Sequence, residues 1–259
     1  MIDVVVGGAT GKLGKLVCDL IVGSDDLRLT GAIVSENGGN AGKELYPGIT
    51  AVTPDSLGSL LRDTDVYVDL TTPAAASMIV GSVPETGANV VLGTTAVDPE
   101  AIEQLTRNVE RYNTSALISA NFALGVNVFW KMCGMLATSL PDYDIELIEA
   151  HHDMKKDAPS GTATEALRRL QEASGIRKTV YGREGVTGPR GREIGVHSIR
   201  AGDIVGDHTV MFAGNMERIE ITHRAISRET FAKGCIQSVR WMSGRKDGRI
   251  HNMDEVLGL

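Results

Sequence analysis

Fifteen residues near the middle of the chain, Glu149–Ala163, form a dense cluster of reactive side chains. They read EAHHDMKKDAPSGTA, with two adjacent histidines, two lysines and two aspartates before a Pro-Ser-Gly-Thr turn. A hydrophobic core does not tolerate this density of charge, because each buried charge must be paired. Histidine exchanges protons near neutral pH, and lysine attracts anions. The segment therefore predicts a site that binds a small polyanion and moves a proton on it.

The elements on either side of this segment can be predicted from the pattern of apolar residues. Ile145–Ile148 predicts a strand, so we expect the polar groups to lie on the loop after it. Thr162 and Glu165 have capping-box spacing, which predicts that a helix begins near Gly161–Ala163. Unpaired N–H groups and the helix dipole let such an end bind a carboxylate or phosphate. The alternative is that Ser160 and Thr162 only cap the helix, with the lysines solvated.

The N-terminus contains a second candidate site. Ile2–Val6 predicts a buried strand, GGATGKLG follows at once, and an apolar helical face comes next. Strand, glycine turn and helix in this order are typical of dinucleotide binding. Gly8 and Gly11 would let the backbone approach a pyrophosphate, and Gly14 would allow close helix packing. Thr10 stands where the usual motif has its middle glycine, so a tight turn before a packed helix remains the alternative.

Strands and helices alternate over the first half of the chain, which predicts βαβ units and a parallel sheet. Strands are expected at Leu29–Val34, Val66–Leu70, Val90–Leu92 and Ala116–Ser119, and helices at 54–61, from Pro73, and at 99–112. Ligands bind outside the carboxyl ends of such strands. Gly93–Thr95 and Ser119–Phe122 would therefore line a cofactor crevice together with the glycine turn. Ordinary turn chemistry is the alternative for each loop taken alone.

The pattern changes after Phe122. A helix around Val126–Leu136 and the strand before the histidines are followed by three runs that alternate in strand fashion, Ile194–Arg200, Asp207–Phe212 and Arg218–His223. We expect a mixed or antiparallel sheet in an α+β substrate domain over residues 123–229. A last helix, Thr230–Ser243, would return to the first domain, so that residues 1–122 and 230–259 form a discontinuous α/β dinucleotide-binding domain. Loop Gly182–Arg192 is expected to be a mobile lid or a disordered crossover.

Composition narrows the class of protein. The formal net charge of −7 over 259 residues argues against binding to nucleic acid or to an anionic membrane. Cys18, Cys133 and Cys235 are far apart and form no metal or redox motif, which favours a reducing cytoplasm. The first strand follows Met1 directly and leaves no room for a signal peptide. No apolar run approaches the length of a membrane span.

The run HHDMKKDAPSGTA resembles the signature of the 4-hydroxy-tetrahydrodipicolinate reductases, formerly called dihydrodipicolinate reductases, of diaminopimelate and lysine biosynthesis. Further segments resemble family segments in the family's order: VVGGATGKLG, VVLGTTA, SANFALGVNV, EIGVHSIRAGDIVGDHTVMF and ERIEITHRAISRETFAKG. The resemblance implies a Rossmann-type domain and a substrate domain whose sheet builds a homotetramer. It also implies a nicotinamide cofactor and a small dicarboxylate substrate, which is reduced by hydride transfer with loss of water.

The resemblance also implies roles for individual residues. His151 would be the general acid and base, and Lys155 the second proton donor. Glu149 and Asp157 would orient these groups. The substrate carboxylates would be bound by four residues, His152, Ser160, Gly161 and Thr162. The cofactor would be bound by residues of three loops, Gly8, Ala9, Thr10, Gly11, Lys12, Leu13, Gly93, Thr94, Thr95, Ser119, Ala120, Asn121 and Phe122. No residue is expected to bind a metal.

One departure from the family pattern concerns the choice of cofactor. Family members often have an acid and then an arginine after the second strand, whereas this chain has Ser35, Glu36 and Asn37. Glu36 would accept hydrogen bonds from ribose hydroxyls, which favours NADH. Lys12 could still pair with the extra phosphate of NADPH, so both cofactors stay open.

Three other classes of protein fit parts of the sequence. One is a Rossmann protein that senses nicotinamide redox state without catalysis. Another is a metal-dependent hydrolase using His151, His152 and Asp153, although adjacent histidines on a strand point to opposite faces. A third is a Rossmann reductase of a different small acid, which would share the glycine turn but not the DAPSGTA run.

Overall fold

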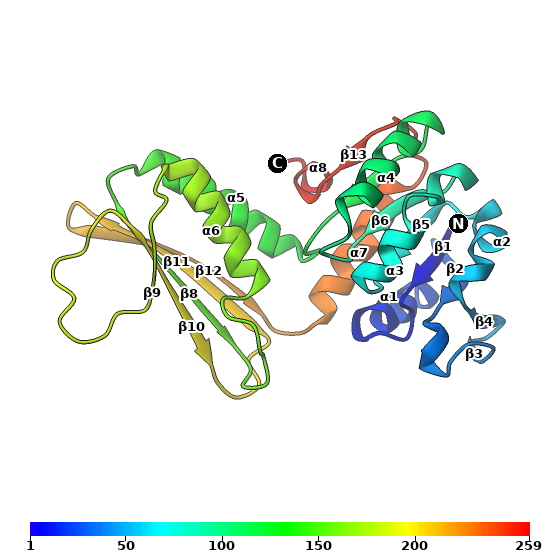
Figure 1. Cartoon of the computed structure of the whole chain (residues 1–259), viewed down its shortest axis with the longest axis horizontal. Coiled ribbons are helices and arrows are strands. Elements are labelled where there is room, and N and C mark those ends of the chain that lie inside the picture. The colour runs from blue at the N-terminus through cyan, green and yellow to red at the C-terminus, as the bar shows by residue number, and fades with distance from the viewer. The chain divides into compact units, whose positions relative to one another are not determined.

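The computed structural model describes all residues from 1 to 259, which form two compact units (Figure 1). Unit 1 consists of Met1–Leu124 and Glu229–Leu259, and unit 2 is the continuous segment Gly125–Arg228. The chain therefore leaves unit 1 once, builds unit 2 and returns. No helix combines the length and the apolar character that crossing a membrane would require.

Unit 1 is built on an eight-stranded sheet with the order β13-β7-β6-β5-β1-β2-β4-β3. Its strands are β1 (Ile2–Gly7), β2 (Leu27–Ile33), β3 (Glu44–Tyr46), β4 (Ile49–Val52), β5 (Val66–Asp69), β6 (Asn89–Leu92), β7 (Ala116–Ile118) and β13 (Ile250–His251). All neighbouring pairs are parallel except β3 with β4. The order runs outward from β1 in both directions, so its switch point lies between β1 and β5. The predicted Rossmann-type parallel sheet is confirmed.

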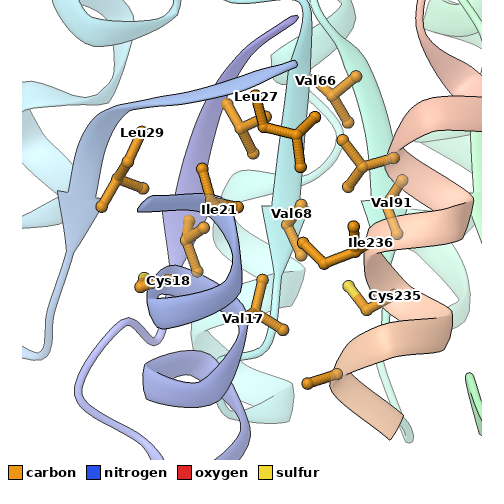
Figure 2. Packing of buried hydrophobic residues seen from close by; sticks show 14 of the residues in the cluster. Val17, Cys18, Ile21, Leu27, Leu29, Val66, Val68, Val91, Cys235 and Ile236 are labelled. Carbon is orange, nitrogen blue, oxygen red and sulfur yellow. The ribbon is translucent and has the colours of Figure 1, made fainter. Parts of the chain in front are cut away.

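Helices cover both faces of this sheet, so its central strands are apolar on both sides. The helices are α1 (Lys12–Val22), α2 (Leu57–Leu60), α3 (Pro73–Ile79), α4 (Pro99–Arg111), α7 (Glu229–Met242) and α8 (Met253–Leu257). On one face, Val17 and Cys18 of α1 and Cys235 of α7 pack with Val66 and Val68 of β5 (Figure 2). On the other face, α2, α3 and α4 bury a second apolar cluster. Helix α7 thus joins the same core as α1, from which it is far removed in sequence.

The predicted helix over residues 54–61 is wrong in detail. The segment forms three short turns, η2 (Pro54–Ser56), α2 and η3 (Leu61–Asp63). Side chains compete with the helix here, since the Ser59 hydroxyl donates to the Ser56 carbonyl and the Thr64 hydroxyl to the Leu60 carbonyl. Strands β3, β4 and β13 and helix α8 were not predicted, because two to five residues of mixed polar and apolar character carry too little pattern.

Unit 2 has a five-stranded sheet with the order β12-β11-β8-β10-β9. Its strands are β8 (Asp144–His151), β9 (Thr179–Tyr181), β10 (Ile194–Arg200), β11 (Gly206–Gly214) and β12 (Glu217–Ala225). Strand β8 is antiparallel to β11 and parallel to β10, which confirms the predicted mixed sheet. Helices α5 (Leu124–Ser139) and α6 (Gly161–Ser174) contact one another through Trp130, whose indole N–H donates to the Thr162 carbonyl. Figure 1 shows both helices alongside the strands.

Strand β8 is longer than predicted, and the cap of α6 differs. Glu149 and His151 belong to the strand rather than to the loop after it. The cap is Ser160, whose hydroxyl accepts from the Ala163 N–H at 3.1 Å, and not Thr162. Glu165 therefore makes no capping box and instead pairs with two arginines of its own helix.

The segment 182–192, which was expected to be a lid or a disordered crossover, is tied to β8 by ion pairs. Arg183 and Arg190 both contact the Glu146 carboxylate, at 3.0 and 3.2 Å. Arg190 also pairs with Asp144 at 2.7 Å, and Arg183 with Glu193 at 3.1 Å. Two arginines of the segment are thus fixed to the start of β8, at the opposite end of that strand from His151.

Candidate functional site

The centre of the site in unit 2 is a histidine and carboxylate pair on β8. His151 Nδ1 lies 2.5 Å from Glu149 Oε2. The two residues are two positions apart on one strand and therefore share a face. A carboxylate only accepts hydrogen bonds, so Nδ1 carries the hydrogen and Nε2 takes no part in this pair. Gly206 leaves room for this atom, because a Cβ at position 206 would lie 3.0 Å from His151 Nε2.

The Glu149 carboxylate is fully buried and is held from several sides. Arg200 of β10 donates to both of its oxygens, at 3.0 and 2.8 Å, and the Ser160 N–H donates to one of them at 3.3 Å. Burial alone would raise the pKa of Glu149, but hydrogen bonds from Arg200, Ser198 and His151 outweigh it and lower that pKa. The carboxylate thus stays charged beside the imidazole.

The pKa of His151 is lowered below its ordinary value. Burial is the main cause, and the nearby positive charges of Lys155 and Arg200 add to it. The hydrogen bond and the charge of Glu149 act in the opposite direction and raise the pKa. Because these effects compete, a bound anion near the ring would favour its protonated form.

A third histidine, His208 of β11, adjoins the pair and was not predicted. Its Nε2 lies 2.9 Å from the Ser160 hydroxyl, and its ring centroid lies 5.2 Å from that of His151. Burial, followed by the charge of His151, lowers the pKa of His208 to about 3. Whichever group donates, the Ser160 hydroxyl is committed to His208 and to the Ala163 N–H of the helix cap. The sequence feature that indicates this residue is its place in the predicted strand Asp207–Phe212, where His208 falls on the same face as the apolar Val210 and Phe212.

The loop and helix end beside the pair are cationic. Lys155 Nζ lies 2.8 Å from both oxygens of Asp157, and this contact is the main reason why the pKa of Asp157 is lowered. The Gly161 N–H at the start of α6 has no partner, and nothing lies within 4 Å of the Cβ position of Gly161. His152 is half-buried just after the strand, and its ring makes no hydrogen bond. Asp153 is exposed and does not converge with the histidines.

The glycine turn of unit 1 lies at the carboxyl end of β1. Gly8 has a φ of +76°, and the Gly8 and Ala9 N–H groups donate to the Ile33 carbonyl. A Cβ at Gly8 would lie 2.2 Å from the Leu70 carbonyl oxygen, and a Cβ at Gly14 would lie 2.0 Å from that of Gly8. Any side chain at either position would collide with backbone, so the turn requires both glycines.

The turn leaves a defined set of N–H groups for a ligand. Helix α1 has Gly11 as its N-cap and no side-chain cap. The Gly11 N–H donates to the Gly8 carbonyl at 2.9 Å. The N–H groups of Thr10, Lys12 and Leu13 donate to no backbone carbonyl. No acidic residue lies in the first turn of α1. The residues present therefore fit the pyrophosphate of a dinucleotide, bound by these three N–H groups and the helix dipole.

The other two predicted cofactor loops follow β6 and β7. Thr95 and Ala120 are exposed, and Thr94 is half-buried. Phe122 is buried against Gly93, where a Cβ would meet its ring at 2.5 Å. The remaining two residues are committed within their own loop: the Ser119 hydroxyl donates to the Asn121 carbonyl at 2.8 Å, and Asn121 Oδ1 accepts from the Ala123 N–H.

The residues that bear on cofactor choice surround the end of β2. Glu36 is exposed in the short turn η1 (Glu36–Gly38), between the exposed Ser35 and Asn37. Lys12 is exposed at the start of α1. An acid and a lysine are thus both open to solvent at this end of unit 1.

A parallel sheet with a glycine turn at its switch point is typical of dinucleotide-binding proteins, and unit 2 contains a buried histidine and carboxylate pair. Comparison with known proteins identifies the family. Residues 2–122 match the family described as "Dihydrodipicolinate reductase, N-terminus", and residues 125–257 match "Dihydrodipicolinate reductase, C-terminus". The chain belongs to the dihydrodipicolinate reductase family and is an oxidoreductase.

Relatives and solved structures agree with this assignment over the full length of the chain. A 4-hydroxy-tetrahydrodipicolinate reductase of Methanosarcina barkeri is 45% identical, with all of both chains covered. One of Methanocaldococcus jannaschii is 43% identical over all of this chain and 98% of its own. A dipicolinate-bound dihydrodipicolinate reductase from Paenisporosarcina sp. TG-14 has a similar structure, with a TM-score of 0.84 and 25% identity over 98% of this chain and 99% of its own.

Proposed function

We propose that the protein reduces 4-hydroxy-tetrahydrodipicolinate to tetrahydrodipicolinate, with loss of water, using NADH or NADPH in diaminopimelate and lysine biosynthesis. Full-length relatives that carry this activity in their names support the reaction. The structural observation that carries the proposal is the buried Glu149–His151 pair beside a cationic helix end. The dipicolinate bound to the similar Paenisporosarcina structure supports a small dicarboxylate ligand.

Lys155 and the start of α6 are proposed to bind the substrate carboxylates. Gly161 and Thr162 contribute the positive end of the helix, and His152 contributes a ring that makes no hydrogen bond within the protein. Lys155 would exchange Asp157 for a substrate carboxylate, because the two anions compete for one ammonium group. Ser160 acts through the helix cap, since its hydroxyl is already committed.

His151 is proposed to supply the proton. The nicotinamide cofactor supplies a hydride, and negative charge then builds on the ring nitrogen of the substrate. A cationic acid at that position lowers the barrier. Substrate carboxylates beside the ring raise the pKa of His151, so binding prepares the imidazolium form. Glu149 holds Nδ1 and stabilises that cation, which leaves the Nε2 proton for the substrate.

Unit 1 is proposed to bind the cofactor. Thr10, Lys12 and Leu13 offer N–H groups for the pyrophosphate, and the exposed Thr95 and Ala120 line the carboxyl ends of the neighbouring strands. Glu36 after β2 favours ribose hydroxyls and therefore NADH, while Lys12 leaves NADPH usable.

A homotetramer built through unit 2 is proposed from the family resemblance. Ile199 and Ile219 on its sheet are 46% and 40% exposed, which a partner subunit would cover. Light scattering after gel filtration measures the mass directly. A cytoplasmic location is supported by three free cysteines, all buried.

The test is a coupled assay. Pyruvate and aspartate semialdehyde are converted to substrate by the preceding synthase, and loss of NADH or NADPH absorbance is followed with the purified protein. We expect oxidation that requires the complete mixture, and the ratio of rates gives the cofactor preference. Binding of both cofactors without oxidation would instead favour the redox sensor. Oxidation with another small keto acid alone would favour the related Rossmann reductases.

A further inference from the structure

A buried carboxylate with no role in the proposed reaction lies at the switch point of the unit 1 sheet. Asp69 is the last residue of β5 and is fully buried. No lysine, arginine or histidine pairs with it. Its Oδ2 accepts from the Tyr67 hydroxyl at 2.8 Å. Its Oδ1 accepts from the Thr71 N–H at 3.1 Å, the Thr71 hydroxyl at 2.8 Å and the Thr94 hydroxyl at 2.6 Å.

These bonds fix the direction of two hydroxyl hydrogens. A carboxylate has no hydrogen to donate, so Thr71 and Thr94 must both donate to Asp69. A hydroxyl has one hydrogen and two lone pairs, and each threonine therefore keeps only acceptor capacity toward its other side. Both threonines are half-buried, whereas Asp69 is covered completely. A ligand at this edge would meet the threonine oxygens and not the carboxylate.

The surrounding backbone places this network between the glycine turn and the loop after β6. The Leu70 N–H donates to the Gly7 carbonyl, and the Gly93 N–H donates to the Asp69 carbonyl. A Cβ at Gly7 would lie 2.3 Å from the Tyr67 hydroxyl and 3.2 Å from Thr71 Cγ2. The threonines thus adjoin the turn whose N–H groups fit a pyrophosphate.

We propose that Asp69 is a positioning residue for the dinucleotide, which fixes Thr71 and Thr94 as hydrogen-bond acceptors toward the cofactor. This inference rests on the proposed use of a nicotinamide cofactor. Two acceptor oxygens bind an N–H or O–H donor of the dinucleotide, such as the carboxamide or a ribose hydroxyl. They repel its pyrophosphate, whose oxygens only accept. The N–H groups of the glycine turn are donors and therefore attract the pyrophosphate. Donors at one place and acceptors at the next thus set which way the dinucleotide lies.

The test is cofactor binding to Asp69→Ala without substrate. The alanine removes the acceptor of both threonine hydroxyls, so their hydrogens are free to turn toward the ligand. Loss of about one hydrogen bond, roughly 1.4 kcal/mol, corresponds to about a tenfold rise in Kd for NADH. Fluorescence titration measures that Kd, and thermal unfolding checks that the variant is folded.

Two further variants separate positioning from structural support. Tyr67→Phe removes the bond to Oδ2 and leaves both threonine contacts, so we expect a lower Tm but an unchanged Kd. Thr94→Val should raise the Kd about as much as Asp69→Ala, and Thr94→Ser should restore it. This pair of variants decides the matter if Asp69→Ala does not fold. Equal weakening in Tyr67→Phe would overturn the proposal, as would wild-type binding in Asp69→Ala and Thr94→Val.

ADP-ribose distinguishes the two donors. It keeps the second ribose and lacks nicotinamide, so equal losses for ADP-ribose and NADH in Asp69→Ala assign the ribose hydroxyls. A loss for NADH alone assigns the carboxamide. Both results support the positioning role. Wild-type protein that binds NADH but shows no turnover in the coupled assay would refute the proposed reaction without touching the role of Asp69.

Discussion

Replacing Glu149 by Gln should shift the pH dependence of the enzyme toward acid. The substitution keeps the size of the side chain and removes the one charge that raises the pKa of His151, while burial, Lys155 and Arg200 continue to lower it. The lost contact is a buried charge-assisted hydrogen bond of 2.5 Å. Such bonds contribute about 1.5–3 kcal/mol, which at about 1.4 kcal/mol per pH unit is a shift of roughly one to two units.

The sign follows from the role of His151 as an acid. Activity requires the protonated ring, so kcat/KM falls as pH rises through the pKa of His151. In Glu149→Gln this falling limb should move about one to two pH units lower, as the estimate above gives. A pH profile with NADH held saturating measures it, and an NMR titration of the His151 ring gives the same pKa independently.

Glu146→Gln is the matched control. Glu146 lies on the same strand and its carboxylate lies 2.8 Å from His197, but it faces away from the buried pair. Its replacement should leave the pH profile in place, although it loosens the segment with Arg183 and Arg190. Profiles of Glu149→Gln and wild type that coincide, with both proteins folded, would refute the reasoning that Glu149 sets the acidity of His151.

Three further results are expected. His151→Gln should lower kcat by about 10²- to 10⁴-fold, the range of general acid catalysis, and wild-type turnover would exclude His151 as the acid. Lys155→Ala should raise the KM for substrate and lower kcat, and should weaken competitive inhibition by pyridine-2,6-dicarboxylate; inhibition unrelated to substrate concentration would count against the pocket. Gly206→Ala places a Cβ 3.0 Å from His151 Nε2, so it should lower kcat and leave the Kd for NADH unchanged. A steady-state assay measures kcat, and fluorescence titration measures the Kd.

The longer elements of the fold could be predicted because each buries one or two faces over enough residues to show a period. Helices α1 and α4 are examples, and the Rossmann-type sheet followed from the alternation of such helices with short apolar runs. Strands such as β9, with three residues, show no period, because pairing with a neighbour decides whether they form. The predicted end of β8, Ile148, comes three residues too early for the same reason. Glu149 and His151 are polar residues typical of a loop, and they belong to the strand because neighbouring strands pair with them.

The candidate site could be predicted where its residues are adjacent in sequence and not where they meet across strands. His151, Lys155 and the start of α6 lie within one short segment. Arg200 is paired in register with His151, and His208 with Glu149, and neither register follows from local pattern. The cap of α6 was ambiguous for a similar reason. Ser160 and Thr162 are both good caps, and the contact between Ser160 and His208 favours the first.

The return of the chain to unit 1 has a consequence during synthesis on the ribosome. Helix α1 is covered by α7, which begins at Glu229, about 200 residues after α1 ends at Val22. At about 5–20 residues per second, this delay is on the order of 10 to 40 s. Unit 2, which is continuous, is complete before α7 emerges. The apolar face of α1 therefore stays uncovered while unit 2 can already fold. We expect the nascent chain to depend on chaperones until α7 is made.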